Sequence, residues 1–509
     1  MPPQHFVILG GGISGLTAAW YLALNAPLTT KITLLEASNR FGGWIQSTRV
    51  GDDRILFEQG PRTLRPVGLG GLVVLDMINR LKISEFVHAL PKDAPAAQNR
   101  YIFYPNKLVK LPGSNLISGI RQTLSTKFLL KSLSAVVREP FVRPVLPNLD
   151  ESVHSFFTRR FNEQLADILI SALAHGIYAG DVKKLSMRST FTNIYNMEKS
   201  YGSVIRGAFS RNPSPPSDED MTLVETINRD NEDLMKIINK SSLYSFKDGI
   251  GQLTNALVKD LRGKPNVELK VDSRVRELKF EDGNEIEIIT NNGKFKGDHI
   301  ISTIPAYELV KLLPMLPHLE YNPFVTVGVV NVAYEQPNLL PIKGFGVLFP
   351  QATPDNRHHV LGIVFDSDTM PLQDHPKDNY TKVTVMLGGH YYETFKEEEL
   401  PDEEELLHQA LQTLETTLGI YATPAEYVAK LQRKCIPQYY VNHHSRLGGL
   451  HNAIKENFKN RLSVCGSSYL GVSINDCVFN SAKLALNLLN DSKKDVVVTG
   501  LERVDVKIE

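Results

Sequence analysis

The sequence is poor in cysteine, has no long apolar run and carries no net charge. Its three cysteines, Cys435, Cys465 and Cys477, are too few and too scattered for a disulfide framework, and they form no Cys-x-x-Cys pair. We therefore expect buried thiols without bridges. No apolar run approaches the roughly 18 to 20 residues needed to cross a bilayer, so we expect no membrane-spanning helix.

The balance of charge excludes a further class of function. The chain has 56 basic and 56 acidic residues and a formal net charge of zero, so no overall field favours nucleic acid as a partner. The first residues, MPPQ, carry no basic region, and we expect no cleavable leader and an internal address for any organelle targeting. A chain of 509 residues is long enough for two or three domains.

Residues 5–44 are the most informative stretch. An apolar, β-branched run at residues 6–9 predicts a buried strand, a helical stretch follows, and a second apolar run leads to Glu36. Between the first strand and the helix lie three glycines with the spacing Gly-x-Gly-x-x-Gly: Gly10, Gly12 and Gly15. This order predicts a dinucleotide site, because the glycines let a pyrophosphate approach the helix N-terminus and the acid can accept hydrogen bonds from ribose. These residues leave open which dinucleotide binds, and a purely structural turn is the alternative.

Two further turns follow this segment. Arg40-Phe41-Gly42-Gly43-Trp44 comes directly after Glu36, and its adjacent glycines suggest close backbone approach. Gly60-Pro61-Arg62-Thr63 is a Gly-Pro turn that presents an arginine, which suits contact with phosphate or ring carbonyls. The alternative for this second turn is an ordinary surface turn.

The middle of the chain reads as helices and then strands. Residues 64–207 are mostly helical in pattern, with a strand-like piece at residues 100–111. An apolar run at residues 128–130 has the basic neighbours Arg121, Lys127, Lys131 and Arg138. Amphipathic basic helices suit either a solvated domain surface or a membrane-surface face. Residues 211–220, RNPSPPSDED, predict a linker.

Several strands are expected after the linker. Residues 267–290 predict a hairpin, and residues 298–303 predict a buried strand that rejoins the opening domain. Four more candidate strands predict a separate sheet: residues 324–334, 344–349, 360–365 and 383–387. His443 and His444 have no matching carboxylate or cysteine cluster, so we expect a loop pair and no metal site.

The C-terminal signal is residues 462–475, LSVCGSSYLGVSIN, which predict a strand that passes through a glycine turn into a helix. This second strand-to-helix junction offers another helix N-terminus. Paired with the first, it could hold the far end of a long flat cofactor, which favours FAD over a nicotinamide.

Eight segments carry a resemblance to a known family. GGGISGL and RFGGW belong to a wide superfamily. The discriminating segments are FEQGPRTLRP, HGIYAGD, KLSMRS, GFGVL, VMLGG and YLGVSINDC. On these segments the chain resembles, nearly from end to end, the protoporphyrinogen oxidases, FAD enzymes of heme synthesis in the amine oxidase and phytoene desaturase superfamily.

The resemblance implies which residues hold a non-covalent FAD: Gly10, Gly11, Gly12, Ile13, Ser14, Gly15, Glu36, Ala37, Arg40, Gly43, Trp44, Gly60, Pro61, Arg62, Thr63, Val275, Ser467, Val472, Ser473 and Ile474. It also implies a macrocycle slot lined by Gly176, Phe345, Leu348 and Met386, although core residues would look the same in sequence. It assigns Arg100 to a substrate propionate. A guanidinium pairs a carboxylate bidentately, and the fixed charges of a porphyrinogen are its propionates.

The implied fold is α/β, with a Rossmann-like FAD-binding domain, a mixed-sheet substrate domain and a helical, membrane-associating domain. We place the discontinuous FAD-binding domain at residues 1–90, 244–310 and 436–509 and the helical domain at residues 91–210. Residues 211–243 form a linker and connecting helix, and residues 311–435 form the substrate-binding sheet domain.

The implied reaction is hydride transfer from protoporphyrinogen IX to the flavin, reoxidation by O₂ to give hydrogen peroxide, and repetition to protoporphyrin IX. No metal and no catalytic side chain is assigned. Eukaryotic members attach to the mitochondrial inner membrane, which implies peripheral or monotopic attachment through the helical domain. A homodimer and a contact with ferrochelatase stay open.

Two rival functions remain from the residues. A flavin amine oxidase would share the opening motifs, but the cysteine that attaches the flavin covalently in monoamine oxidases has no evident counterpart here. A non-catalytic FAD-binding protein would share the fold without turning over substrate.

Overall fold

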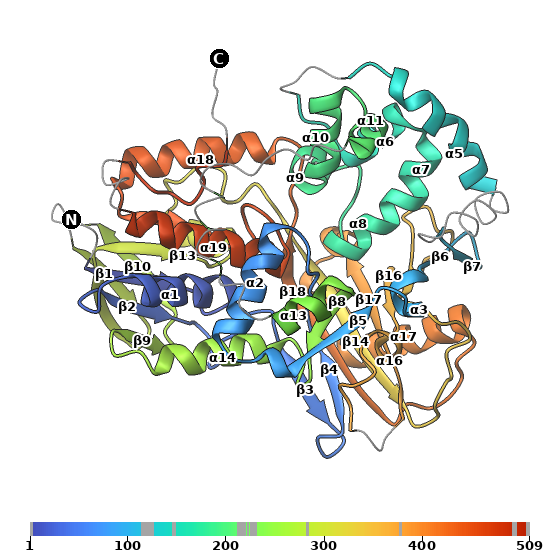
Figure 1. The fold of residues 1–509 in the computed structure, drawn as a ribbon, viewed down its shortest axis with the longest axis horizontal. Helices are drawn as coiled ribbons and strands as arrows, with labels where there is room; N and C mark the ends of the chain where they lie inside the picture. The colour runs from blue at the N-terminus through green and yellow to red at the C-terminus, as the bar shows by residue number, and fades with distance from the viewer. Residues whose placement is uncertain are drawn as a thin grey trace.

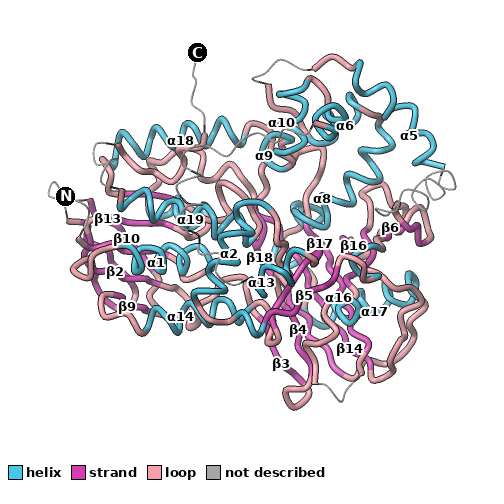
Figure 2. Tube along the Cα trace, in the orientation of Figure 1, coloured by secondary structure: helices cyan, strands magenta, loops and turns pink. Residues whose placement is uncertain are grey.

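The computed structural model describes residues 4–112, 127–144, 149–210, 220, 223, 227, 232–280, 285–375, 379–490 and 496–504. Figure 1 shows a layered unit that contains both ends of the chain, a large sheet at the lower right, and a group of helices at the upper right. Figure 2 shows the same three parts by secondary structure, with strands gathered on the left and in the lower right.

The layered unit is built on a five-stranded parallel sheet in the order β19-β13-β1-β2-β9. Its strands are β1 (His5–Leu9), β2 (Lys31–Leu35), β9 (Val267–Lys270), β13 (His299–Ser302) and β19 (Leu462–Val464). The central strands are apolar and buried because layers cover both faces of the sheet. The segment predicted to rejoin the opening domain does so, since β13 pairs with β1 along Phe6↔His299 to Leu9↔Ser302.

Helices cover one face of the parallel sheet: α1 (Ile13–Asn25), α2 (Gly68–Arg80), α14 (Gly251–Arg262) and α19 (Ile474–Leu489). The other face is covered by an antiparallel sheet of β10 (Val275–Phe280), β11 (Ile286–Thr290) and β12 (Gly293–Gly297), with α15 (Ala306–Leu312) and α18 (His443–Phe458). The predicted hairpin of residues 267–290 is therefore only partly right. Its first strand, β9, joins the parallel sheet, and β10 and β11 alone pair antiparallel.

The large sheet has seven strands in the order β18-β14-β17-β16-β15-β6-β7. They are β6 (Tyr101–Phe103), β7 (Leu108–Lys110), β14 (Phe324–Tyr334), β15 (Gly346–Leu348), β16 (Val360–Val364), β17 (Thr381–Gly389) and β18 (Glu426–Pro437). The four strands predicted after the linker are all present in this separate sheet. Helix α17 (Glu403–Leu418) packs against it through buried residues such as Leu406 and Leu414.

Two small sheets connect the parts. One pairs β3 (Ser47–Val50) with β4 (Ile55–Glu58), and the other pairs β5 (Val87–Pro91) with β8 (Ser241–Phe246). The sequence does not predict the β5–β8 pair. The remaining short helices of the described chain outside the helical part are η1 (Ser84–Phe86), α3 (Pro95–Gln98), α13 (Glu232–Asn239), α16 (Asp366–Thr369), η4 (His390–Thr394) and η5 (Glu397–Glu399).

The helical part forms its own core around Phe156, Phe157 and Ala174. Its elements are α5 (Lys127–Arg138), η2 (Glu139–Phe141), α6 (Val153–Arg160), α7 (Glu163–Leu165), the π-helical turn η3 (Ala166–Ile170), α8 (Ser171–Tyr178), α9 (Met187–Thr190), α10 (Thr192–Tyr201) and α11 (Val204–Phe209). The predicted linker at residues 211–219 and the turn at residues 281–284 lie outside the described residues. Within the described part of the chain, no helix is long and apolar enough to span a bilayer.

Candidate active site

The glycine turn between β1 and α1 has the geometry that its spacing predicts. Gly10 has a φ of +100°, which suits glycine, and a Cβ on Gly15 would lie 1.9 Å from the carbonyl oxygen of Gly10. Gly12 precedes the first helical residue, Ile13, and no side chain caps the helix. The first N–H groups of α1, including that of Ser14, thus have no side-chain cap, which leaves donors and the positive end of the helix dipole for an anion.

Glu36 lies at the end of β2, next to the glycine turn. Its carboxylate accepts hydrogen bonds from the backbone N–H of Gly11 at 2.7 Å and of Ser38 at 2.7 Å. The carbonyl oxygen of Glu36 accepts from the N–H of Ser273, which holds the approach to Val275 against the end of β2. Ala37 is exposed beside it. The structure therefore brings Glu36, Ala37 and the segment of Val275 to one edge of the parallel sheet.

The segment that contains Arg40 wraps over the glycine turn. Its guanidinium donates to the carbonyl oxygen of Gly43 at 2.6 Å and of Ile45 at 3.2 Å, so part of its hydrogen-bonding capacity holds its own loop. Gly12 and Gly42 form a β-bridge, and a Cβ on Gly43 would lie 3.0 Å from the Cα of Gly12. Trp44 is partly exposed and its carbonyl oxygen lies 2.2 Å from where a Cβ on Gly60 would stand.

Arg62 is buried and only partly paired. Its Nη1 donates to Asp366 Oδ1 at 2.9 Å, while Nε and Nη2 have no hydrogen-bond partner among the described residues. Unsatisfied buried donors are costly, so an absent acceptor is expected at this point. A flavin with its ring carbonyls would supply one, and this turn, with Pro61 and Thr63 beside Arg62, fits FAD.

The predicted C-terminal junction lies next to the first one. Strand β19 leads through Gly466 and Ser467 to Ser473, whose hydroxyl caps α19 by accepting from the N–H of Asp476 at 3.1 Å, and α19 begins at Ile474. A Cβ on Gly466 would lie 3.6 Å from Ser14 Oγ. The side chains of Ser14, near the start of α1, and Cys477, near the start of α19, are hydrogen-bonded, and the two helices lie side by side (Figure 1), as a cofactor held by both helix N-termini requires.

Two residues that the sequence did not point to support the loop that carries Ser467 and Val472. The hydroxyl of Tyr439 donates to the carbonyl oxygen of Ser467 and accepts from the N–H of Gly471 at 3.0 Å. His443 stacks on the Tyr439 ring with 4.2 Å between ring centroids.

The prediction of a loop pair at His443 and His444 is wrong. Both residues start helix α18, and His443 is buried. Its Nδ1 accepts from Asn322 Nδ2 at 2.7 Å, and its Nε2 donates to the carbonyl oxygen of Tyr469 at 2.8 Å. Burial lowers the pKa of His443 to about 4, so the ring is neutral at neutral pH.

Three of the predicted slot residues meet in the large sheet. Leu348 of β15 pairs with Gly362 of β16, and Gly362 pairs with Met386 of β17, so Leu348 and Met386 lie in one cross-strand row with a glycine between them. Directly paired residues point to the same face of a sheet. Gly176 of α8 packs on this row, since a Cβ there would lie 3.0 Å from Leu348 Cδ2.

Arg100 and Phe345 stand at the near end of the same strands. β6 runs parallel to β15 with Val347↔Tyr101 and Leu348↔Ile102, so Arg100 precedes β6 beside the start of β15. The N–H of Phe345 donates to the carbonyl oxygen of Asn99 at 3.0 Å, which fixes that neighbourhood. The strand-like piece predicted at residues 100–111 thus joins the large sheet and brings Arg100 to the slot residues.

The surroundings of Arg100 are cationic. Burial and the charge of Arg65 both lower the pKa of Arg100, and no carboxylate among the described residues lies within salt-bridge distance of it. Two guanidinium groups near each other without a described counter-ion suit an anionic substrate group.

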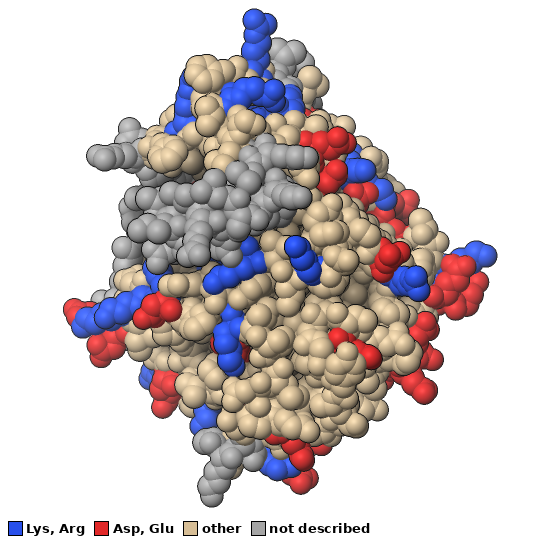
Figure 3. All heavy atoms as spheres, turned by 90° about the vertical axis from the view of Figure 1, so that its right-hand side faces the viewer, with Lys and Arg blue, Asp and Glu red and all other residues tan. Residues whose placement is uncertain are grey.

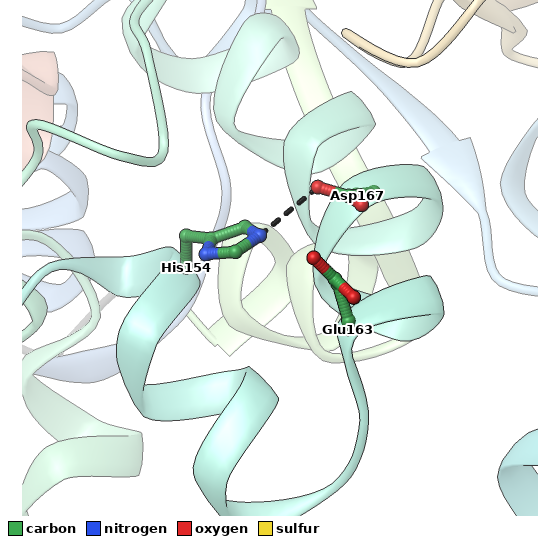
Figure 4. A group of neighbouring side chains, drawn as sticks. All are labelled: His154, Glu163 and Asp167. Carbon is green, nitrogen blue, oxygen red and sulfur yellow. Dashed lines mark hydrogen bonds and ion pairs between the residues drawn. The ribbon is translucent and has the colours of Figure 1, made fainter.

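A separate group of potential metal ligands lies in the helical part. His154, Glu163 and Asp167 have ligand atoms within 4.8 Å of one another. Figure 4 shows His154 bonded to Asp167, at 3.0 Å between Nε2 and Oδ1, with Glu163 beside them. This hydrogen bond accounts for the contact between two of the three side chains, and the group contains none of the predicted site residues.

Comparison with known proteins is consistent with this geometry. Residues 13–485 match the family described as flavin containing amine oxidoreductase. A protoporphyrinogen oxidase of Schizosaccharomyces pombe is 37% identical over 96% of this chain and 100% of its own length. A mitochondrial protoporphyrinogen oxidase of Nicotiana tabacum is 27% identical over 97% of this chain and 96% of its own length.

A solved structure shares the fold. A protein from Exiguobacterium sp. 255-15, provisionally named protoporphyrinogen oxidase, superposes with a TM-score of 0.75 at 22% identity, over 95% of this chain and 98% of that one. At this identity the likeness describes the fold. Together with the family match and the yeast relative, it shows that the chain belongs to the flavin containing amine oxidoreductases and, within them, to the protoporphyrinogen oxidases.

Proposed function

We propose that this protein oxidises protoporphyrinogen IX to protoporphyrin IX in heme biosynthesis, with FAD as cofactor and O₂ as electron acceptor. The observation that carries the proposal is the row Leu348–Gly362–Met386 with Gly176 packed on it. Arg100 lies two residues before Ile102, the residue of β6 that pairs with Leu348. A row of apolar side chains with a cation nearby suits a flat apolar macrocycle whose charges are its propionates. Membership of the family supplies the reaction class.

The residues that would hold FAD are divided by the part of the cofactor they suit. The N-terminus of α1 at Gly12 suits the pyrophosphate, Glu36 suits the ribose hydroxyls, and Arg62 and the start of α19 suit the flavin end. When bound, FAD would accept two electrons as a hydride from a meso carbon of the substrate. O₂ would reoxidise the reduced cofactor and form hydrogen peroxide.

This chain's own residues bind and orient the substrate. Leu348 and Met386 would contact the ring, Gly176 would leave room beside Leu348, and Phe345 would close the end of the slot near Arg100. Three two-electron oxidations convert the porphyrinogen to the porphyrin, and each removes one hydride and one proton. Of the six hydrogens lost, four come from the meso carbons and two from pyrrole nitrogens, and the protons pass to water or to the peroxide that forms. No side chain is assigned as the proton acceptor.

We also propose that the protein is mitochondrial and attaches to a membrane surface through α5 and η2. Val137 and Phe141 are exposed to 72% and 80%, and the basic residue Arg143 is exposed next to them. Exposed apolar side chains beside cationic ones suit an anionic lipid surface. Figure 3 views the side of the molecule on which α5 lies, and Lys and Arg side chains gather at the top of this view.

The test of the function uses the purified protein with its flavin spectrum recorded. Protoporphyrinogen IX or an amine such as putrescine is added, and porphyrin fluorescence and hydrogen peroxide are followed. The proposal predicts porphyrin formation well above the uncatalysed rate together with peroxide. Peroxide from the amine alone favours an amine oxidase, and a yellow protein that turns over neither substrate favours a non-catalytic role.

A further inference from the structure

We propose that a pair of histidines, the buried His175 and the partly buried His390, positions the macrocycle slot by tying together the three elements that carry Gly176, Leu348 and Met386. This inference rests on the proposed function, because it assigns these three residues to the substrate. The pair lies behind the slot and is not assigned a contact with substrate, so both are positioning residues.

The hydrogen bonds fix how each ring is protonated. His175 Nδ1 lies 2.6 Å from the carbonyl oxygen of Phe349, and because a carbonyl only accepts, Nδ1 carries the hydrogen. The Nε2 of neutral His175 is therefore an acceptor, and it lies 2.9 Å from His390 Nε2, which donates to it. Burial and the neighbouring His390 lower the pKa of His175 to about 3, and burial lowers the pKa of His390 to about 4. Both rings are thus neutral at neutral pH.

Each bond of the pair ends next to a slot residue. Phe349 directly follows Leu348 at the end of β15, and Gly176 directly follows His175 in α8. The bond from His175 to Phe349 therefore holds α8 against β15 at the point where Gly176 packs on Leu348.

The second histidine ties the end of β17 to the same helix. The N–H of His390 donates to the carbonyl oxygen of Ala179 at 2.8 Å, and a Cβ on Gly389 would lie 2.4 Å from that same oxygen. Met386 lies four positions before His390. The bond between the two rings adds a side-chain tie to this backbone bond, and together they hold α8 against the end of the strand that carries Met386.

Polar and aromatic side chains surround the pair. Gln351 Nε2 donates to Asp181 Oδ1 at 3.1 Å and lies 3.3 Å from His390 Nε2, and the Tyr391 ring lies 4.0 Å from that of His390. Asp181, Glu393, Lys184 and His359 are the charged or titratable groups that act on His390. Since a flat ligand must fit between elements held at a set spacing, we expect small shifts of α8 to weaken binding of the macrocycle.

The test compares His175→Ala, His390→Ala and His175→Asn with the flavin-loaded wild type. In His175→Asn the amide Nδ2 can replace Nδ1 as donor to Phe349. We expect His175→Ala to raise KM for protoporphyrinogen IX about tenfold, the effect of losing one buried hydrogen bond, and His390→Ala about fivefold. We expect His175→Asn to stay within about threefold of wild type, with kcat and flavin content unchanged in all three.

His299 is the matched control. It is equally buried and bonded through both ring nitrogens, to the carbonyl oxygen of Asn460 and to Ser463, but it lies in β13 of the parallel sheet. We expect His299→Ala to lower Tm and leave KM unchanged. An unchanged KM in both His175→Ala and His390→Ala, or a KM increase in His299→Ala as large as theirs, overturns the inference while porphyrin formation by the wild type upholds the proposed function.

A second measurement separates the two proposals when the wild type forms no porphyrin. Binding of protoporphyrin IX is then followed by fluorescence quenching. A Kd that rises in His175→Ala and returns toward wild type in His175→Asn supports the positioning role of the pair even though the proposed reaction fails. A wild type that binds no macrocycle overturns both.

Discussion

At the scale of single residues, substitution of Arg100 tests substrate binding, and we expect it to leave the fold intact. It stands beside the slot strands with Arg65 nearby and no described carboxylate within salt-bridge distance. We expect Arg100→Ala to lower kcat/KM by about 1.5 to 3 kcal/mol of transition-state stabilisation, the scale of a charge-assisted hydrogen bond. Steady-state porphyrin formation measures it.

The matched variant is Arg100→Lys, which keeps the charge but loses the planar fork. We expect it to recover part of the loss. A value of kcat/KM in Arg100→Ala equal to that of wild type would remove this residue from the site. Arg433→Ala serves as a control for general charge, because Arg433 pairs with Glu397 at the surface.

Gly12 tests the pyrophosphate site without disturbing the protein itself. Its φ is −73°, and a Cβ there would meet no protein atom closer than 3.8 Å, so alanine fits the apoprotein. A bound pyrophosphate would approach that same space. We expect Gly12→Ala to leave the Tm of the apoprotein unchanged. We expect it to raise the Kd for FAD roughly ten- to a hundredfold, the effect of losing one or two charge-assisted hydrogen bonds.

The contrast is Gly15→Ala, whose Cβ would lie 1.9 Å from the carbonyl oxygen of Gly10. That variant should lose stability even without cofactor. Flavin content and thermal unfolding of the apoprotein measure both variants. Equal FAD affinity in Gly12→Ala and wild type would show that the cofactor does not approach the turn at this point.

Local contacts explain which residue roles could be predicted from the sequence. Gly10 and Gly15 contact each other five positions apart, so spacing alone indicated their role. His443 acts through Asn322, which is 121 positions away, and His175 acts through His390, 215 positions away. Such pairs leave no periodicity and no short motif in the sequence. Their partners can be identified only once the fold is known.

At the scale of elements, the junctions that could be predicted are those in which strand, turn and helix follow directly in the chain. β1 to α1 and β19 to α19 are of this kind. The β5–β8 pair joins segments about 150 positions apart, and β6 lies in parallel beside β15. Pairing over such distances depends on the packing of the whole chain and leaves no local pattern.

The face formed by α5 and η2 gives a test at this scale. We expect Phe141→Glu to weaken binding to anionic liposomes about tenfold, because burying a phenylalanine contributes about 1.5 to 3 kcal/mol. Tyr421→Glu is the control, since Tyr421 is exposed to 77% at the C-terminal end of α17, next to the large sheet. Liposome flotation measures both. An equal loss of liposome binding in both variants would mean that the face around α5 is not the membrane-binding surface.

At the scale of the whole molecule, buried neutral histidines couple folding to pH. The pKa is lowered to about 3 in His175 and to about 4 in His299, His390 and His443, chiefly by burial. Below pH 6.5 the unfolded chain binds protons that these folded residues do not, so stability present above pH 6.5 is lost as pH falls toward 4.

Each such histidine contributes a loss of about 1.4 kcal/mol per pH unit in that range. Glu58 offsets the loss of stability from one of these histidines. Burial raises the pKa of Glu58 to about 7, so in this pH range the folded state keeps a proton that the unfolded chain releases. We expect the free energy of unfolding, measured by urea titration, to fall steeply from pH 6.5 to 5. A flat profile would mean that these histidines titrate normally in the folded protein.

The large-scale organisation combines a unit assembled from both ends of the chain, the proposed cofactor site, with a large sheet that carries the proposed substrate contacts. The sequence indicated the two halves of the cofactor unit through their glycine turns. It did not indicate that β6 and Arg100 join the large sheet, which places the proposed propionate contact beside the proposed ring contacts.

The central claim is that this molecule oxidises a porphyrinogen at a flavin site. The most direct measurement is the rise of porphyrin fluorescence when protoporphyrinogen IX is added to the purified, flavin-containing protein in air, with peroxide followed in parallel. The account predicts porphyrin formed far faster than in buffer, with peroxide in a ratio of three to one and a strong loss in Arg100→Ala. Porphyrin formation at the uncatalysed rate by a fully flavin-loaded protein would contradict it.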